Sequence, residues 1–187
     1  MGKMILASSS PRRAEILKDY KLEIIPSPYI EQHTQTAFSY AYVEDLAYNK
    51  AFAVIPLVND EKLIIGADTV VVLGDEILEK PKDKNDAYLM LKKLSGKTHS
   101  VVTAISIINS KTQKSKTEST TSFVTFKELS DERIWDYINK YNPLDKAGSY
   151  GIQELPDGFV EKVEGDFENI IGISSSTLKK MLSEFKL

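Results

Sequence analysis

The chain has 187 residues, of which 42% are hydrophobic and 27% charged, a composition that excludes intrinsic disorder and a collagen-like repeat and favours one globular domain over residues 1–187. It has no cysteine and two histidines, which excludes disulfide bridges and thiolate zinc sites, argues against a multi-histidine metal site, and makes the cytoplasm the expected compartment. The net charge of -3 argues against nucleic acid as a partner, and the apolar runs are too short for a signal peptide or a membrane span.

Hydrophobic periodicity, capping residues and turn residues predict strands and helices that interleave along the chain. In chain order we expect a strand over Met4–Ala7, helices over Pro11–Tyr20 and Ala37–Ile55, a strand over Leu63–Leu73, a hairpin partner at Ile77–Glu79, a helix over Asn85–Leu94, strands over Val101–Ile108 and Phe123–Phe126, a helix over Asp131–Lys140, two short strands around Gly165-Asp166, and a helix over Ser176–Glu184. The polar stretch from Asn109 to Ser122 is typical of a hairpin loop. Because hairpins exclude a purely parallel sheet, the predicted class is mixed α/β.

Two arginines follow the predicted start of the first helix. Ser10 is in the N-cap position and Pro11 in the first helical position, so Arg12 and Arg13 fall in the first turn. That turn carries a partial positive charge and normally favours Asp or Glu. The mismatch disappears if an anion such as phosphate binds there, whereas the alternative is that both arginines point into solvent. The chain has no G-x-x-x-x-G-K-[ST] motif, which excludes a P-loop NTPase.

Asp68 is the second anomaly, because it interrupts an apolar, β-branched strand. An ionised carboxylate in such a strand is costly unless it is paired, hydrogen-bonded or bound to a metal. A bulge or a strand end at Gly66-Ala67 could present Asp68 and Thr69 at a cleft. The alternative is an ordinary turn aspartate that caps nearby N–H groups.

Five other polar residues are weaker candidates, because local sequence favours an ordinary surface, loop or packing position for each: Glu31, Lys50, Lys80, Gln153 and His99. Lys80 precedes a proline, so its backbone is held extended and its side chain is directed. The amide of Gln153 both donates and accepts, as reading a base edge requires. Asp68 and Glu31, completed by phosphates and water, form the kind of oxygen donor set that Mg²⁺ uses. For His99 we favour a packing role.

Five segments together resemble the Maf family of nucleoside-triphosphate pyrophosphatases, and the likeness spans almost the whole chain in the same order. They are LASSSPRRAEIL (6–17), IGADTVV (65–71), EKPKD (79–83), LKKLSGKTHSVVTA (91–104) and PLDKAGSYGIQ (143–153). Within the family the chain is similar to the dTTP/UTP pyrophosphatase type, since Thr69 directly follows the aspartate and Gln153 ends the last segment. The resemblance implies hydrolysis of a pyrimidine nucleoside triphosphate to the monophosphate and pyrophosphate, with a divalent cation, Mg²⁺ or Mn²⁺, in the cytoplasm.

The resemblance also assigns roles to individual residues. It implies that Asp68 is the proton acceptor, and that Arg13, Thr69 and Gln153 govern substrate choice. Residues at phosphate-contacting or catalytic positions are Ser8, Ser10, Arg12, Lys50 and Lys80. Glu31 is the implied second acidic residue and, with Asp68, the implied metal ligand. The sequence leaves open which of the two, Asp68 or Glu31, binds the metal and which acts as the general base.

The fold that the resemblance implies is an elongated, Maf/ITPase-like mixed sheet flanked by helices, with a cleft between two lobes, and the implied assembly is a homodimer. Two functions other than hydrolysis are possible from the sequence. One is a regulator of septum formation or cell division that binds nucleotides without turnover. The other is a nucleic-acid binder, which the acidic balance disfavours.

Overall fold

The computed structural model describes residues 4–31 and 37–185, and its centre is a seven-stranded sheet in the order β2-β1-β3-β5-β6-β7, with β4 paired to one end of β3. The strands are β1 (Met4–Leu6), β2 (Glu23–Ile24), β3 (Leu63–Leu73), β4 (Glu76–Leu78), β5 (Thr98–Asn109), β6 (Ser115–Phe126) and β7 (Val160–Glu164). The helices are α1 (Pro11–Ile16), α2 (Tyr40–Phe52), α3 (Lys84–Leu94), α4 (Asp131–Tyr141), α5 (Phe167–Ile171) and α6 (Ser175–Leu182). β1 pairs in parallel with β2 and β3 and the other pairs are antiparallel, which confirms the mixed α/β prediction.

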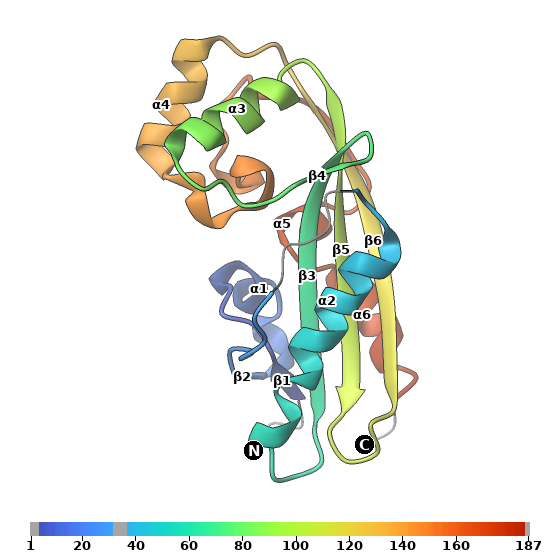
Figure 1. Ribbon diagram of the computed structural model, residues 1–187. Helices are drawn as coiled ribbons and strands as arrows, with labels where there is room; N and C mark the ends of the chain where they lie inside the picture. Colours follow the sequence, from blue (N-terminus) through green and yellow to red (C-terminus); the bar gives the residue numbers. More distant parts are fainter. Residues whose placement is uncertain (1–3, 32–36, 186–187) are drawn as a thin grey trace.

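Three long strands, β3, β5 and β6, run along the length of an elongated molecule (Figure 1). Helix α2 crosses one face of these strands, whereas α5 and α6 lie against the other face. At one end α3 and α4 pack against each other, and at the other end β1, β2 and α1 flank β3. The molecule therefore has two lobes that share the long strands, as expected. None of the helices described is long and apolar enough to cross a membrane.

Separate apolar clusters stabilise the two lobes. In the α3–α4 lobe, Leu91, Phe126 and Tyr137 belong to one buried cluster. At the other end, Ile105 and Met181 belong to a second cluster, which joins α6 to β5. Burying a side chain of this size contributes about 1.5–3 kcal/mol, so each cluster supports its lobe and together they hold the shared strands in register.

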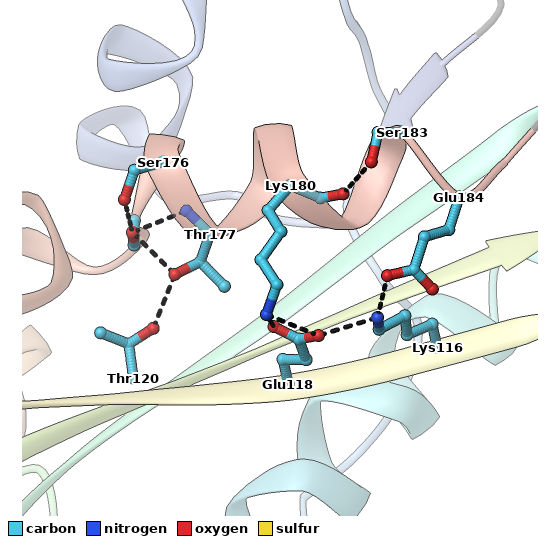
Figure 2. Close-up of polar contacts among 9 residues, drawn as sticks. Lys116, Glu118, Thr120, Ser176, Thr177, Lys180, Ser183 and Glu184 are labelled. Carbon is cyan, nitrogen blue, oxygen red and sulfur yellow. Dashed lines mark hydrogen bonds and ion pairs between the residues drawn. The ribbon is translucent and has the colours of Figure 1, made fainter.

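The polar stretch from Asn109 to Ser122 was predicted as a loop, and this prediction is wrong. Strand β6 begins at Ser115 and pairs with β5 over its whole length, so only residues 110–114 connect the two strands. Hydroxyl and charged side chains replace apolar ones along this strand because they meet polar side chains of α6. Thr120 and Thr177 lie 2.9 Å apart through their hydroxyl oxygens (Figure 2).

Charged side chains continue the same contact between β6 and α6 (Figure 2). The Glu118 carboxylate forms two ion pairs. Its Oε1 lies 2.9 Å from Lys116 Nζ, and its Oε2 lies 3.2 Å from Lys180 Nζ. Lys116 also pairs with Glu184 beyond the end of α6. A strand whose polar groups are paired in this way gives no hydrophobic alternation, so its sequence resembles that of a loop.

Some element boundaries, and one element, also differ from the prediction. The first helix ends at Ile16 and continues as a short 3-10 turn over Lys18–Tyr20, and α2 begins only at Tyr40, after Ser39 accepts a hydrogen bond from the Tyr42 amide. Only one strand, β7, adjoins Gly165-Asp166. The second predicted strand is instead helix α5, because the Asp166 carboxylate caps it by accepting from the amides of Glu168 and Asn169.

Asp68 lies in an uninterrupted strand, so the predicted bulge at Gly66-Ala67 is absent. β3 and β5 pair in constant register from Leu63–Asn109 to Val72–Ser100. On the other edge of β3, β1 pairs only as far as Ile65, and β4 pairs only from Val71. Among the described strands none covers this edge between these two points. Asp68 is therefore a buried residue that borders a gap between two partner strands.

Gly66 permits α2 to lie directly on β3. A Cβ at this position would lie 2.3 Å from the Ala47 carbonyl oxygen and 2.7 Å from the Ala51 amide nitrogen, both backbone atoms of α2. The helix could not sit at this depth over any other residue. This contact sets how close the next side chains of α2 come to the middle of β3.

His99 is a buried packing residue, as expected. Its Nε2 lies 2.7 Å from the Tyr150 hydroxyl, and its ring meets the edges of Phe126 and Tyr150. Its side chain has no acidic partner within ion-pair distance among the described residues, and burial lowers its pKa to about 4 from an ordinary value of 6.5. The folded protein therefore holds the imidazole neutral over most of the pH range.

We expect Gly66→Ala to lower the free energy of unfolding by about 2–3 kcal/mol, because the new methyl group meets backbone atoms that cannot move without shifting α2. Gly74→Ala is the matched control. Gly74 has φ +63 and open space around it, so only the left-handed backbone is strained there, at about 1 kcal/mol. Denaturant unfolding of both variants measures the difference, and equal losses would contradict a tight α2–β3 contact.

We expect His99 to make the protein less stable as the pH falls from 6.5 to about 4. In this window the unfolded chain binds a proton at His99 that the folded chain does not, so protonation favours unfolding, by up to about 3 kcal/mol. The measurement is the unfolding free energy of wild type and His99→Gln across this window. Carboxylates titrate alike in both proteins, so the difference between the two curves isolates His99, and parallel curves would show that its burial does not matter.

Candidate functional site

A cavity of about 460 Å³ lies between the two lobes, and ten of the candidate residues named from the sequence line it, whereas His99 does not. These residues are Ser8, Ser10, Arg12, Arg13, Glu31, Lys50, Asp68, Thr69, Lys80 and Gln153. They come from the turn after β1, from α1, from the segment after β2, from α2, from β3, from the loop after β4, and from the 3-10 turn Ile152–Glu154. The Ser-Pro-Arg-Arg turn and the Gly-Ala-Asp-Thr segment therefore share one cavity.

Two carboxylates and one ammonium group form the centre of the site. Lys50 Nζ lies 2.5 Å from Asp68 Oδ1 and 2.6 Å from Glu31 Oε1, and the three side chains are only 14%, 9% and 23% exposed. Lys50 reaches this point because α2 lies so close to Gly66, two residues before Asp68. An ion pair this shielded from water is much stronger than one on the surface, and removing either partner leaves an uncompensated charge.

The start of α1 has the geometry that the sequence predicted. The Ser10 hydroxyl caps the helix by accepting from the Arg13 amide at 3.5 Å, and Ser8 Oγ accepts from the Ser10 amide at 3.2 Å. Both serines line the cavity, so the cap and the turn before it face the same space. Just after β1, the Ala7 amide donates the last backbone hydrogen bond to β3, at the Ile65 carbonyl. Beyond this bond the turn diverges from β3 and opens the gap beside Asp68.

Arg13 points inward and is held by neutral acceptors. Its guanidinium donates to the Gly172 carbonyl at 2.8 Å, to Thr69 Oγ1 at 3.0 Å and to Ser8 Oγ at 3.3 Å. Burial lowers the pKa of Arg13, while the nearby Asp68 carboxylate opposes this change. An arginine keeps its charge despite such a shift. The alternative in which both arginines point into solvent is therefore wrong for Arg13.

Thr69 continues this chain of hydrogen bonds into the sheet. Its hydroxyl lies 2.8 Å from Thr103 Oγ1 on β5, and Thr103 donates to the Asn169 carbonyl at 2.9 Å. Because Thr103 uses its proton on Asn169, Thr69 donates to Thr103 and presents its lone pairs to Arg13. The position directly after Asp68 thus orients a cavity-lining guanidinium.

Arg12 crosses the cavity to the other lobe, where its Nη1 lies 3.3 Å from Asp145 Oδ2. Lys80 and Gln153 are both exposed and line the same cavity from the α3–α4 lobe. Neither Lys80 nor Arg13 has a carboxylate within ion-pair distance among the residues described here. Two cations of the lining are thus not engaged in a close ion pair with the protein.

Several lining groups were not identified from the sequence. Lys146 is buried and pairs with Asp145 at 2.8 Å and with Glu154 at 3.3 Å. Its position within PLDKAGSYGIQ was the available signal. The Gly172 carbonyl could not be found, because a backbone acceptor leaves no mark on residue type. The apolar part of the lining belongs to the buried cluster of the α3–α4 lobe, and its residues are Val71, Val101, Ala147, Tyr150, Ile152 and Ile170.

Comparison with known proteins finds bacterial relatives of similar length and a longer human one. A "dTTP/UTP pyrophosphatase" from Thermoanaerobacter sp. strain X514 is 42% identical over 182 residues, which cover 96% of this chain and 95% of that protein. A second protein of that name, from Ruminiclostridium cellulolyticum, is 44% identical over 187 residues, 98% of this chain and 96% of that protein. A human "Probable bifunctional dTTP/UTP pyrophosphatase/methyltransferase protein" is 40% identical, over 96% of this chain and 31% of its own length.

A solved structure of a nucleoside-triphosphatase / dITP/XTP pyrophosphatase from Mycobacterium abscessus is 15% identical and has a TM-score of 0.44, over 67% of this chain and 75% of that chain, a likeness too distant to bear on this site. The model of the family described as "Maf-like protein" matches residues 3–185. With this match over nearly the whole length, and with relatives above 40% identity, the chain belongs to the Maf-like protein family.

Proposed function

We propose that this protein hydrolyses dTTP and UTP to the nucleoside monophosphate and pyrophosphate in the cavity between its lobes. The observation that carries the proposal is the meeting of Asp68 and Glu31 at the Lys50 ammonium group, inside a cavity whose wall also carries Arg12, Arg13 and Lys80. Proteins that carry the name dTTP/UTP pyrophosphatase match this chain over nearly its whole length, which supports the same substrate class.

The lining suggests how a nucleotide would lie. Cationic groups and serine hydroxyls face the phosphate side, where a triphosphate would displace the weak Arg12–Asp145 contact and engage Arg12, Arg13 and Lys80. The apolar side, which includes Val71 and Ile152, would receive the base and sugar. Gln153 follows Ile152 in the chain, lines the same cavity, and can both donate and accept at a base edge.

The acidic pair would activate water for attack on the α-phosphate. We assign Asp68 the role of proton acceptor because its Oδ2 is not the oxygen that contacts Lys50, and because Asp68 stands at the open edge of β3. Lys50 holds the two carboxylates at one point, and the guanidinium of Arg13 stabilises negative charge on the phosphates. The leaving group is pyrophosphate, whose charge Lys80 and Arg12 would offset.

Asp68 and Glu31 also fit a divalent cation, Mg²⁺ or Mn²⁺. Mg²⁺ is commonly held by one or two carboxylates, with phosphate oxygens and water completing its shell, and two carboxylates converge here on one cationic group. Among the described residues no group of three or more acidic or histidine ligands exists, so phosphates would have to supply the rest. When bound, such a cation would neutralise phosphate charge during hydrolysis.

We further propose that the protein acts in the cytoplasm, as the absence of cysteine favours. The homodimer implied by the family resemblance stays a prediction, which the molecular mass in solution tests.

Purified protein mixed with dTTP or UTP and Mg²⁺ should release pyrophosphate in equal amount to the monophosphate, and a chelator should abolish the release until Mg²⁺ or Mn²⁺ is added back. Release of inorganic phosphate with a diphosphate product would contradict the position of cleavage. Tight nucleotide binding without pyrophosphate release would instead favour a regulator that binds nucleotides, including one that acts in septum formation or cell division.

Asp68→Asn should lower the turnover of dTTP at least about a hundredfold, because an amide cannot accept the proton from water. The variant keeps the shape of the side chain, so circular dichroism should be unchanged. Asp75→Asn, in the exposed turn between β3 and β4, is the matched control and should keep wild-type turnover. Wild-type turnover of Asp68→Asn would remove the assigned role.

A further inference from the structure

Lys146 is a buried lysine in the cavity wall that the proposed chemistry does not use. Its side chain is 8% exposed, and it is placed between two carboxylates, Asp145 Oδ1 at 2.8 Å and Glu154 Oε2 at 3.3 Å. An ammonium group is costly to bury unless it is paired. Glu154 is only 35% exposed and Asp145 is 62% exposed, so the more shielded of the two pairs is the one with Glu154.

The pair between Lys146 and Glu154 lies directly against the turn that carries Gln153. A Cβ at position 151 would lie 3.0 Å from Lys146 Cε and 3.1 Å from Glu154 Oε2. The backbone at Gly151 therefore lies close to both side chains, and a larger residue there would force at least one of them to shift. Lys146 supports the turn from one side.

The same turn is anchored at its other side by a buried tyrosine. The Gly151 amide donates to the Tyr137 hydroxyl at 3.1 Å, and the Glu154 amide donates to the Gly151 carbonyl at 2.9 Å, which closes the turn. Gln153 itself makes no hydrogen bond to the rest of the described chain. Its position in the cavity thus depends on the turn alone, and the turn depends on Tyr137 and Lys146.

We propose that Lys146 is a positioning residue for base selection, which acts through Glu154 to hold the Gly151–Glu154 turn and hence Gln153 at the cavity wall. The proposal rests on the proposed function, since it takes the cavity to hold a nucleoside triphosphate. Lys146 is also linked to the side of the cavity that would hold the phosphates. Asp145 pairs with Lys146 through Oδ1 and with Arg12 through Oδ2.

The contact with Asp145 fits this role. Partial burial alone would raise the pKa of Asp145, but hydrogen bonds from Lys146 and Arg12 outweigh it and leave the pKa below its ordinary value. When Arg12 leaves Asp145 to pair with a phosphate, Asp145 remains paired with Lys146. The carboxylate therefore stays anchored while Arg12 changes partners.

Lys146→Met tests the proposal, because it keeps an unbranched side chain that is one atom shorter and removes the charge. The readout is the kcat/KM for dTTP divided by that for dATP. We expect this ratio to fall about tenfold, with a smaller change in kcat for dTTP, because a turn that is free to move loses the discrimination between bases that Gln153 supplies. Glu154→Gln should lower the ratio similarly, and the double variant should be no worse than either single one.

Lys62→Met is the matched control. The Lys62 side chain is 9% exposed, close to the 8% of Lys146, and it pairs with Glu23 at 2.5 Å, but it does not line the cavity. Both lysine variants should lower the melting temperature, whereas only Lys146→Met should alter the ratio. An unchanged ratio in both Lys146→Met and Glu154→Gln would overturn the proposal, as would an equal fall in Lys62→Met. If Lys146→Met does not fold, Glu154→Gln alone decides, because it breaks the same pair.

A binding measurement separates this proposal from the proposed function. Analogues of dTTP and dATP with a methylene group between the α and β phosphates cannot be hydrolysed there, and the ratio of their Kd values reports selection without turnover. If wild type fails to release pyrophosphate but binds the dTTP analogue selectively, and Lys146→Met loses this selectivity, the proposed function fails while the role of Lys146 stands. Equal binding ratios in wild type and variant would reject the role of Lys146, whatever the turnover.

Discussion

The close contact of α2 with β3 at Gly66 is the constraint on which the rest of the site depends. Backbone atoms of Ala47 and Ala51 occupy the space of a missing side chain, so α2 lies low enough for Lys50 to reach Asp68 at 2.5 Å. The ammonium group then brings Glu31 to the same point from a loop that has no regular structure. A helix held one side chain farther from the sheet would leave a buried carboxylate at Asp68 without a counter-ion.

Charge in the cavity is nearly balanced, and the balance explains how it can receive a polyanion. The lining carries five cationic side chains and four carboxylates, and each carboxylate has a cationic partner. Arg13 and Lys80 have no carboxylate partner within ion-pair distance among the described residues. The partner of Arg12 is the exposed Asp145, which also pairs with Lys146. Surface pairs of this kind contribute about 0–1 kcal/mol, so exchanging Asp145 for a phosphate oxygen costs Arg12 little. The pairs deep in the cavity, at Lys50 and Lys146, keep their partners.

The two deep lysines act on different parts of the site. Lys50 gathers the acidic groups beside the phosphates, whereas Lys146 supports the turn beside the apolar side, and Asp145 links the second lysine to Arg12. In the proposed function, one part of the cavity therefore carries out hydrolysis and the other selects the base. One buried ammonium group organises each part. The long strands β3 and β5, which serve both lobes, hold the halves in a constant relation.

Local signals in the sequence determined most of the elements and two members of the site, Asp68 and Arg13, whereas the family resemblance supplied members such as Glu31, Lys50 and Gln153. Ser10 before Pro11 marks a helix start, the apolar run of β3 marks a buried strand, and Asp68 and Arg13 were identified because each conflicts with its local surroundings. These are interactions between residues a few positions apart, so sequence alone reveals them. The tertiary structure decided the polar strand β6, the gap beside Asp68, and the partners of Lys146. Those depend on contacts between segments far apart in the chain, where register and helix depth, rather than residue type, determine which groups meet.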